Sequence, residues 1–164
     1  LKDLYAVGLI DRLPRLISAQ AEGCCPINRA VVRGGGWEPM EENTFADSIA
    51  VGVPRNGDKA LMAIRESRGL AVNVSDREIM EAQQLLGRSC GVFGEPAGVT
   101  ATAGVKKLCE QGILGREETV VSVVTGNGLK DVANAIKACG EPISIPGDMN
   151  ALLRAFSDSG IVVE

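Results

Sequence analysis

The stretch from residue 119 to residue 131, Thr-Val-Val-Ser-Val-Val-Thr-Gly-Asn-Gly-Leu-Lys-Asp, limits the possible folds more than any other part of the chain. Its first half is a β-branched apolar run, which is typical of a strand buried on both faces of a parallel sheet. The run ends at Thr125, and a glycine turn and a helical pattern over residues 130–139 follow. This order places ligands at the carboxyl edge of a parallel sheet. The stretch predicts a buried strand with a ligand-facing turn, although such turns also serve as plain connections.

Strand and helix patterns alternate along the rest of the chain. Strands are expected over residues 15–20, 70–74, 92–95 and 119–125, and helices beginning near residues 44, 56, 75 and 96, with a mobile loop over 33–44. Ser75 and Glu78 have capping-box spacing, and Pro96 suits the first helical position because it lacks an amide hydrogen. The pattern predicts an α/β fold, three-layer αβα with a mostly parallel sheet. We expect one incomplete domain over residues 1–164, with residues 132–164 as a less certain C-terminal extension.

Composition argues against several classes of partner. The net charge of -4 and the absence of a long basic run argue against nucleic acid. No apolar segment approaches the roughly 20 residues of a membrane span, so we expect no membrane partner. The chain begins with Leu1 and has neither a signal peptide nor an initiator methionine. We therefore expect that its N-terminus has been cut or processed.

The five cysteines and the absence of histidine limit the chemistry. Without histidine and without a Cys-x-x-Cys motif, neither a metal site of the usual zinc spacing nor a histidine-based triad is expected. The cysteines are interpreted as reduced small hydrophobic residues of a cytoplasmic protein. Cys24 and Cys25 could form a reactive thiol site, but no basic neighbour in the sequence favours a thiolate there.

Three places carry side chains or backbone that could contact a ligand. Glu95 precedes Pro96 at a helix start, where a carboxylate either caps the helix or serves as a site carboxylate. Thr125 either places its hydroxyl at the sheet edge or is one more β-branched strand residue. Gly52, within residues 48–54, either lets a flat ring lie against the backbone or ends a helix.

Four motifs, in this order along the chain, resemble the threonine synthases, which are pyridoxal-phosphate enzymes of the tryptophan-synthase-β type, fold type II. They are residues 13–16 (Leu-Pro-Arg-Leu) running into 20–23 (Gln-Ala-Glu-Gly), Ser48 and Ile49 with Gly52 and Pro54, residues 94–97 (Gly-Glu-Pro-Ala) before a helix of small residues, and the closing residues 125–131. Order and spacing agree from about residue 9 to residue 131. The resemblance implies that the chain is a C-terminal portion of such an enzyme and the major part of its large domain.

The resemblance also implies cofactor contacts. A hydroxyl at the position of Thr125 donates to the pyridine nitrogen of pyridoxal 5'-phosphate, which suits an unprotonated nitrogen. Glu95 is expected near the polar edge of the ring. The expected cofactor-binding residues are Thr125, Gly126, Asn127, Glu95, Val51 and Gly52.

The implied reaction converts O-phospho-L-homoserine and water to L-threonine and phosphate in a cytoplasmic lyase of threonine biosynthesis. The Schiff-base lysine and the phosphate-binding glycine loop of these enzymes belong to motifs upstream of Leu1. The lysines of this chain, Lys130 included, fall outside the lysine motif. We therefore expect no catalytic residue here, no activity of this chain alone, and no cofactor bound to it alone.

Two rival interpretations remain. The first is another fold type II enzyme, such as a dehydratase or a sulfonate-forming relative. The second is a non-catalytic module that binds a ligand or partner through an exposed sheet edge. A portion without its upstream strands exposes a sheet edge and apolar surface, and both predict a homo-oligomer, a dimer or larger.

Overall fold

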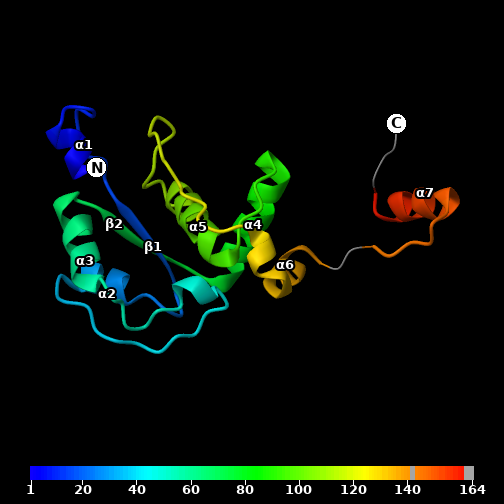
Figure 1. Cartoon of the computed structure of the whole chain (residues 1–164), viewed down its shortest axis with the longest axis horizontal. Helices are drawn as coiled ribbons and strands as arrows, with labels where there is room; N and C mark the ends of the chain where they lie inside the picture. Colours follow the sequence, from blue (N-terminus) through cyan, green and yellow to red (C-terminus); the bar gives the residue numbers. More distant parts are fainter. Residues whose placement is uncertain (141–142, 161–164) are drawn as a thin grey trace.

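A computed structural model describes residues 1–140 and 143–160, and Figure 1 shows their arrangement. Residues 141–142 and 161–164 of the predicted C-terminal extension lie outside the described residues. Two short 3₁₀ turns, η1 and η2, accompany the helices and strands. The elements are α1 (Lys2–Ala6), β1 (Ile17–Ala21), α2 (Pro26–Arg33), η1 (Asp47–Ile49), α3 (Gly57–Glu66), β2 (Leu70–Val74), α4 (Asp76–Cys90), α5 (Pro96–Glu110), η2 (Gly128–Lys130), α6 (Val132–Cys139) and α7 (Met149–Asp158).

The sheet consists of β1 and β2, which pair in parallel with Ile17 opposite Leu70 and Ala21 opposite Val74. Successive side chains of a strand point to opposite faces, so each strand presents two different surfaces. On one face Ala19 and Val72 meet α5, where Gly104 lets the helix approach: a Cβ there would lie 2.8 Å from Val72 Cγ1. The predicted strands 15–20 and 70–74 are thus confirmed, the first shifted by one to two residues.

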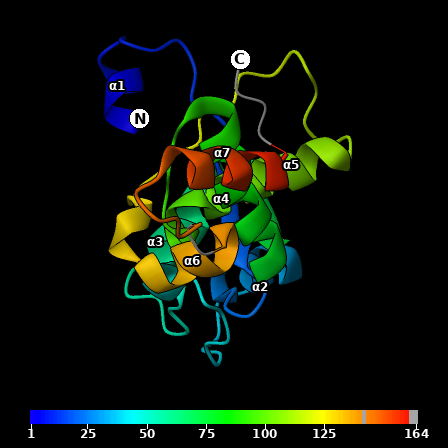
Figure 2. The ribbon, with the colours of Figure 1, turned by 90° about the vertical axis from the view of Figure 1, so that its right-hand side faces the viewer.

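The opposite face of the sheet is polar at its centre and is covered by α2. Asn28 is buried, and its side-chain amide donates to Val72 O at 2.9 Å and to Asn73 Oδ1 at 2.6 Å. The backbone amide of Asn28 donates to Gln20 Oε1 at 2.9 Å. Helix α3 packs on α2, and α4 packs on α5 (Figures 1 and 2). The layers are therefore helix, parallel sheet and helix, as the predicted αβα fold requires.

The local signals at helix starts are mostly confirmed. Ser75 Oγ accepts from the Glu78 amide at 3.3 Å and Glu78 Oε2 accepts from the Ser75 amide at 2.6 Å, so the capping box forms. Pro96 is the first residue of α5. Helix α2 is not among the predicted helices. Pro26 occupies its first helical position, where the missing amide hydrogen of proline costs nothing.

The predicted strand over residues 119–125 is wrong in two respects. These residues form no strand within the described part of the chain, and Val121 and Val123 are 84% and 66% exposed. Ser122 and Val124 are partly buried, and Ser122 Oγ lies 3.0 Å from Thr102 Oγ1 of α5. The segment thus alternates as a strand does, but a strand exists only where a neighbour pairs with its backbone groups. No described segment does so, which leaves one face open.

The predicted strand over residues 92–95 is also wrong. It is reduced to a single bridge between Gly94 and Asn127. The two segments run together for too few residues to build a ladder. This bridge nevertheless matters, because it joins the start of α5 to the closing motif.

An ion pair between α4 and α5 makes the stability of the fold depend on pH. Burial opposes the charged form of Glu78, but hydrogen bonds from the Ser75 amide and from Lys107 outweigh it and lower the pKa of this carboxyl. A lowered folded-state pKa stabilises the fold above the unfolded pKa of about 4.3, and this contribution is lost as pH falls through the folded value. We expect Glu78→Gln to cost about 1 kcal/mol at pH 7 and much less at pH 3, by urea unfolding.

The matched control is Glu81→Gln on the same helix. Glu81 lies 3.8 Å from Lys106 and its side chain is 43% exposed, so its loss should change stability little at either pH. If Glu78→Gln lowered the free energy of unfolding equally at pH 7 and pH 3, this would contradict the assigned role of the ion pair.

Candidate functional site

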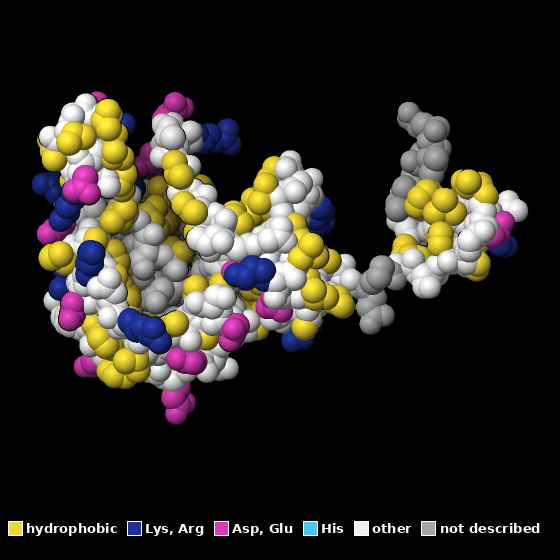
Figure 3. All heavy atoms as spheres, in the orientation of Figure 1, with side chains coloured by type: hydrophobic (Ala, Val, Ile, Leu, Met, Phe, Trp, Pro, Cys, Tyr) yellow, Lys and Arg dark blue, Asp and Glu magenta, His cyan; other side chains and the backbone are white. Residues whose placement is uncertain are grey.

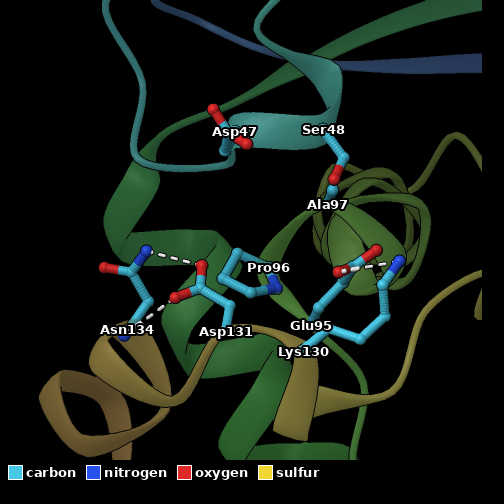
Figure 4. Close-up of a pocket in the computed structure, with 8 residues that line it drawn as sticks. All are labelled: Asp47, Ser48, Glu95, Pro96, Ala97, Lys130, Asp131 and Asn134. Carbon is cyan, nitrogen blue, oxygen red and sulfur yellow. Dashed lines mark hydrogen bonds and ion pairs between the residues drawn. The ribbon is translucent and has the colours of Figure 1, made fainter.

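A polar pocket of about 460 Å³ lies where α5, η1 and the start of α6 meet (Figure 4). Asp47 and Ser48 form one wall, and the first turn of α5 and the closing motif form the other. Its lining residues are Asp47, Ser48, Glu95, Pro96, Ala97, Lys130, Asp131 and Asn134. The pocket therefore joins three segments that are far apart in the sequence, and each of them belongs to a stretch for which a ligand contact was predicted.

Glu95 is the most buried charged residue of the pocket, with 7% exposure. It occupies the N-cap position of α5, but its side chain makes no capping hydrogen bond. The carboxylate instead pairs with Lys130, whose Nζ lies 3.6 Å from Glu95 Oε2. The interpretation of Glu95 as a side-chain cap is therefore wrong, and its carboxylate faces the pocket (Figure 4).

The closing motif lies directly against the start of α5. The Glu95 amide donates to Gly126 O at 2.9 Å, and the Gly128 amide donates to Phe93 O at 2.9 Å. A Cβ on Gly126 would lie 2.0 Å from Glu95 Oε1, and a Cβ on Gly98 would lie 3.0 Å from Gly126 N. These glycines permit the close approach that packs the closing turn onto the helix.

The other predicted site residues lie outside the pocket lining. Thr125 is exposed, and Asn127 Oδ1 accepts from the Leu129 amide at 2.9 Å, which caps η2. The Gly52 amide donates to Glu42 Oε1 at 2.8 Å, so Val51 and Gly52 pack towards the loop before η1. Of the six predicted residues, Glu95 lines the pocket and Gly126 packs against Glu95, and a contact of any of the six with a ligand stays a prediction.

Sequence reasoning missed several lining residues. Asp131 and Lys130 lie within the closing motif, but neither was predicted to line a pocket; Lys130 was considered only as a Schiff-base lysine. Asp47 follows the expected helix start near residue 44 and was not predicted as a site residue either. Asp131 Oδ1 accepts from the Asn134 amide at 3.2 Å and caps α6. The three-residue spacing of Asp131 and Asn134 at a helix start was the available signal, because such pairs share one face of the first turn.

The cysteine pair is not part of this pocket. Cys24 and Cys25 are both buried, and burial raises the pKa of the Cys24 thiol. A raised pKa keeps a thiol protonated and unreactive near neutral pH. Within residues 1–140 and 143–160, no cluster of three acidic or cysteine side chains could hold a metal ion, and no helix there is long and apolar enough to cross a membrane.

Comparison with known proteins identifies the family. Residues 4–126 match the model of the family described as "Pyridoxal-phosphate dependent enzyme". The chain belongs to this family. The match of this pyridoxal-phosphate family includes the start of α5 and reaches Gly126, so it contains Glu95 and the residue packed against it.

Individual relatives agree. A threonine synthase from Methanocaldococcus jannaschii is 45% identical over 159 residues, which is 96% of this chain and 39% of that protein. The chain thus spans about two fifths of the length of this relative. Solved structures of threonine synthase from Escherichia coli and of maize serine racemase each give a TM-score of 0.62 over 95% of this chain, covering 40% and 43% of those chains. At 19% and 16% identity, they show the fold alone.

The charge of the pocket limits how much of pyridoxal phosphate it could contact. Asp47, Glu95 and Asp131 contribute three carboxylates to the lining, and Lys130 contributes one ammonium group that already pairs with Glu95. A phosphate dianion in such surroundings is repelled rather than held. The lining of this pocket therefore does not fit the phosphate of the cofactor, which leaves only the ring to be contacted from this side.

Proposed function

We propose that this chain is a C-terminal portion of a threonine synthase. The enzyme is a lyase that uses pyridoxal 5'-phosphate to convert O-phospho-L-homoserine and water to L-threonine and phosphate. The 45% identity to the M. jannaschii threonine synthase carries the proposal, because it extends over 96% of the chain. The closing motif at residues 125–131 supports it independently, since it packs against Glu95 as a site wall.

The chain supplies both walls of the pocket and so a part of the active site. The buried Glu95 carboxylate, held near Lys130, presents an acceptor to the pocket, and Ser48 offers a hydroxyl from the opposite wall. The cofactor supplies the electron sink of the reaction when it is bound. Phosphate anchoring and the Schiff-base lysine belong to the rest of the enzyme, so this chain alone has no activity. Thr125, Gly126, Asn127, Val51 and Gly52 are proposed as further cofactor contacts.

We also propose the domain organisation, the location and the oligomeric state. Residues 1–164 form a single incomplete domain with an extension over residues 132–164; α7 has no buried residue, which supports the extension, whereas α6 buries Ala135 and Ala138. The protein is cytoplasmic and forms a dimer. Large apolar side chains that are mostly exposed, such as Leu9 at 72% and Val121 at 84%, support association. Figure 3 shows apolar side chains, in yellow, at many places on one face of the molecule.

A chimera tests the function. This chain is fused after the part of the M. jannaschii threonine synthase that precedes its matched residues, and phosphate release and threonine formation from O-phospho-L-homoserine are measured. We expect the chimera to exceed this chain alone by at least about 10³-fold, because enzymes accelerate reactions by far more than that. The intact M. jannaschii enzyme is the positive control.

Three results would count against the proposal. They are activity of this chain alone, a folded chimera without activity beside an active control, and a chimera that dehydrates serine or threonine but releases no phosphate. The last result would favour the dehydratase interpretation.

A further inference from the structure

The Asn134 side chain connects the two walls of the pocket. Its Nδ2 donates to Asp131 Oδ2 at 2.7 Å on the closing-motif side and to Phe45 O at 3.4 Å, two residues before Asp47. We call these two contacts the Asn134 bridge. Figure 4 shows Asn134 and Asp131 in contact below the segment that carries Asp47.

Each end of the bridge adjoins a pocket residue. Asp131 follows Lys130, which reaches the buried Glu95 carboxylate at 3.6 Å. Phe45 packs against the buried core, and its carbonyl accepts from the Asp47 amide at 2.9 Å. A shift of Asn134 therefore changes the position of the Asp47 wall relative to the Glu95 wall.

The segment before η1 is also held from the other side. Thr44, which was expected to cap a helix, instead donates to Asp76 Oδ1 at 2.6 Å, and the Phe45 amide donates to Asp76 Oδ2 at 3.2 Å. Asp76 belongs to α4, which is fixed in the core. The segment is thus anchored to the core by Asp76 and to the closing motif by Asn134.

We propose that Asn134 is a positioning residue: its bridge sets the separation of the two pocket walls and so aligns the site for the reaction. The expected loss of activity rests on the proposed function, whereas the expected effect on the position of the pocket walls does not. The charge-assisted hydrogen bond from the half-buried Asn134 amide to Asp131 fixes the Asn134 side chain, and the neutral hydrogen bond to Phe45 O then reaches the segment before η1. Such a contact can hold a short segment that has few hydrogen bonds of its own.

The first test uses this chain as it is and needs no activity. Hydrogen exchange of the Asp47, Ile49 and Ala50 amides, which are hydrogen-bonded within η1, is compared between the wild-type chain and Asn134→Ala. We expect exchange about tenfold faster in the variant, because the hydrogen bond from Asn134 Nδ2 to Phe45 O is lost. The β2 amides should be unchanged.

The control variant is Lys137→Met. Lys137 Nζ donates to Asn134 Oδ1 at 3.2 Å, so this change removes a hydrogen bond of the same side chain but leaves the bridge intact. Exchange in η1 should stay at the wild-type rate. The Asn134 backbone amide still donates to Asp131 in both variants, so the start of α6 is preserved.

The second test uses the active chimera. We expect Asn134→Ala to lower kcat/KM by about tenfold or more, with the larger loss in kcat, since substrate would still bind but would be misaligned. The thermal midpoint should move by only a few degrees, and Lys137→Met should change neither value. Faster exchange together with this loss supports the proposal.

Other results overturn it. Unchanged exchange in Asn134→Ala would show that the bridge does not hold the wall. Faster exchange with unchanged kcat/KM would show that wall separation does not matter for the reaction, and equal effects of Lys137→Met would remove the role of the bridge. A wild-type chimera without activity would refute the proposed function, and the exchange result would still decide whether the bridge holds the wall.

Discussion

Replacing Ile79 with alanine should destabilise the chain by about 3 kcal/mol, a large fraction of the stability of a typical domain. Ile79 is fully buried where α4 packs on α5, in the core cluster that contains Val74 and Val99. The change removes apolar contacts and leaves a cavity that the packed helices and sheet can only partly fill. Urea unfolding followed by circular dichroism measures the loss.

Leu85→Ala on the same helix is the matched control. Leu85 is 44% exposed, and alanine is the better helix former, so this change should cost about 1 kcal/mol or less. A similar loss for both variants would mean that α4 does not pack on α5 through Ile79. The prediction depends only on the fold and holds whatever the protein does.

Local signals predicted the parts of the fold whose stabilising contacts lie close in sequence. The capping box of Ser75 and Glu78 and the start of α5 at Pro96 depend on neighbouring backbone groups alone, and both form. Strand β2 spans the predicted residues 70–74, because its alternate side chains meet α5 and α2 within the described chain. The αβα layers follow from these elements.

Signals that depend on distant partners were misleading. The valine run over residues 119–125 has the composition of a buried strand, but pairing depends on a neighbour that composition does not specify. The segment keeps only the alternation of exposed and partly buried side chains that a strand has, with Val121 and Val123 exposed. Helix α2 was missed because the proline at its start is ambiguous in a sequence: proline ends some elements and begins others.

The candidate site was predicted in part for the same reason. Glu95 and Gly126 were found because each belongs to a recognisable motif. Asp47 and Asn134 belong to none, and only the three-dimensional arrangement brings them to the same pocket. Nothing in the sequence indicated that Asn134 would contact the carbonyl of Phe45, 89 residues earlier.

Gly126→Ala should destabilise the chain by about 2 kcal/mol, because an added Cβ would lie 2.0 Å from Glu95 Oε1 and 2.3 Å from its Cδ. The carboxylate would have to leave its buried position near Lys130. The cost should largely disappear when the obstructing side chain is removed. In a Glu95→Ala background, Gly126→Ala should therefore cost under about 0.5 kcal/mol.

A double-mutant cycle measures this coupling by urea unfolding of the wild type, both single variants and the double variant. The coupling energy should exceed about 1 kcal/mol, which separates a direct contact from independent effects. Gly87→Ala is the control: it lies within α4 with open space around it, so alanine should stabilise the helix by up to about 1 kcal/mol. Additive losses for Gly126 and Glu95 would show that the closing turn does not pack on the Glu95 carboxylate, and would remove the physical basis of this pocket wall.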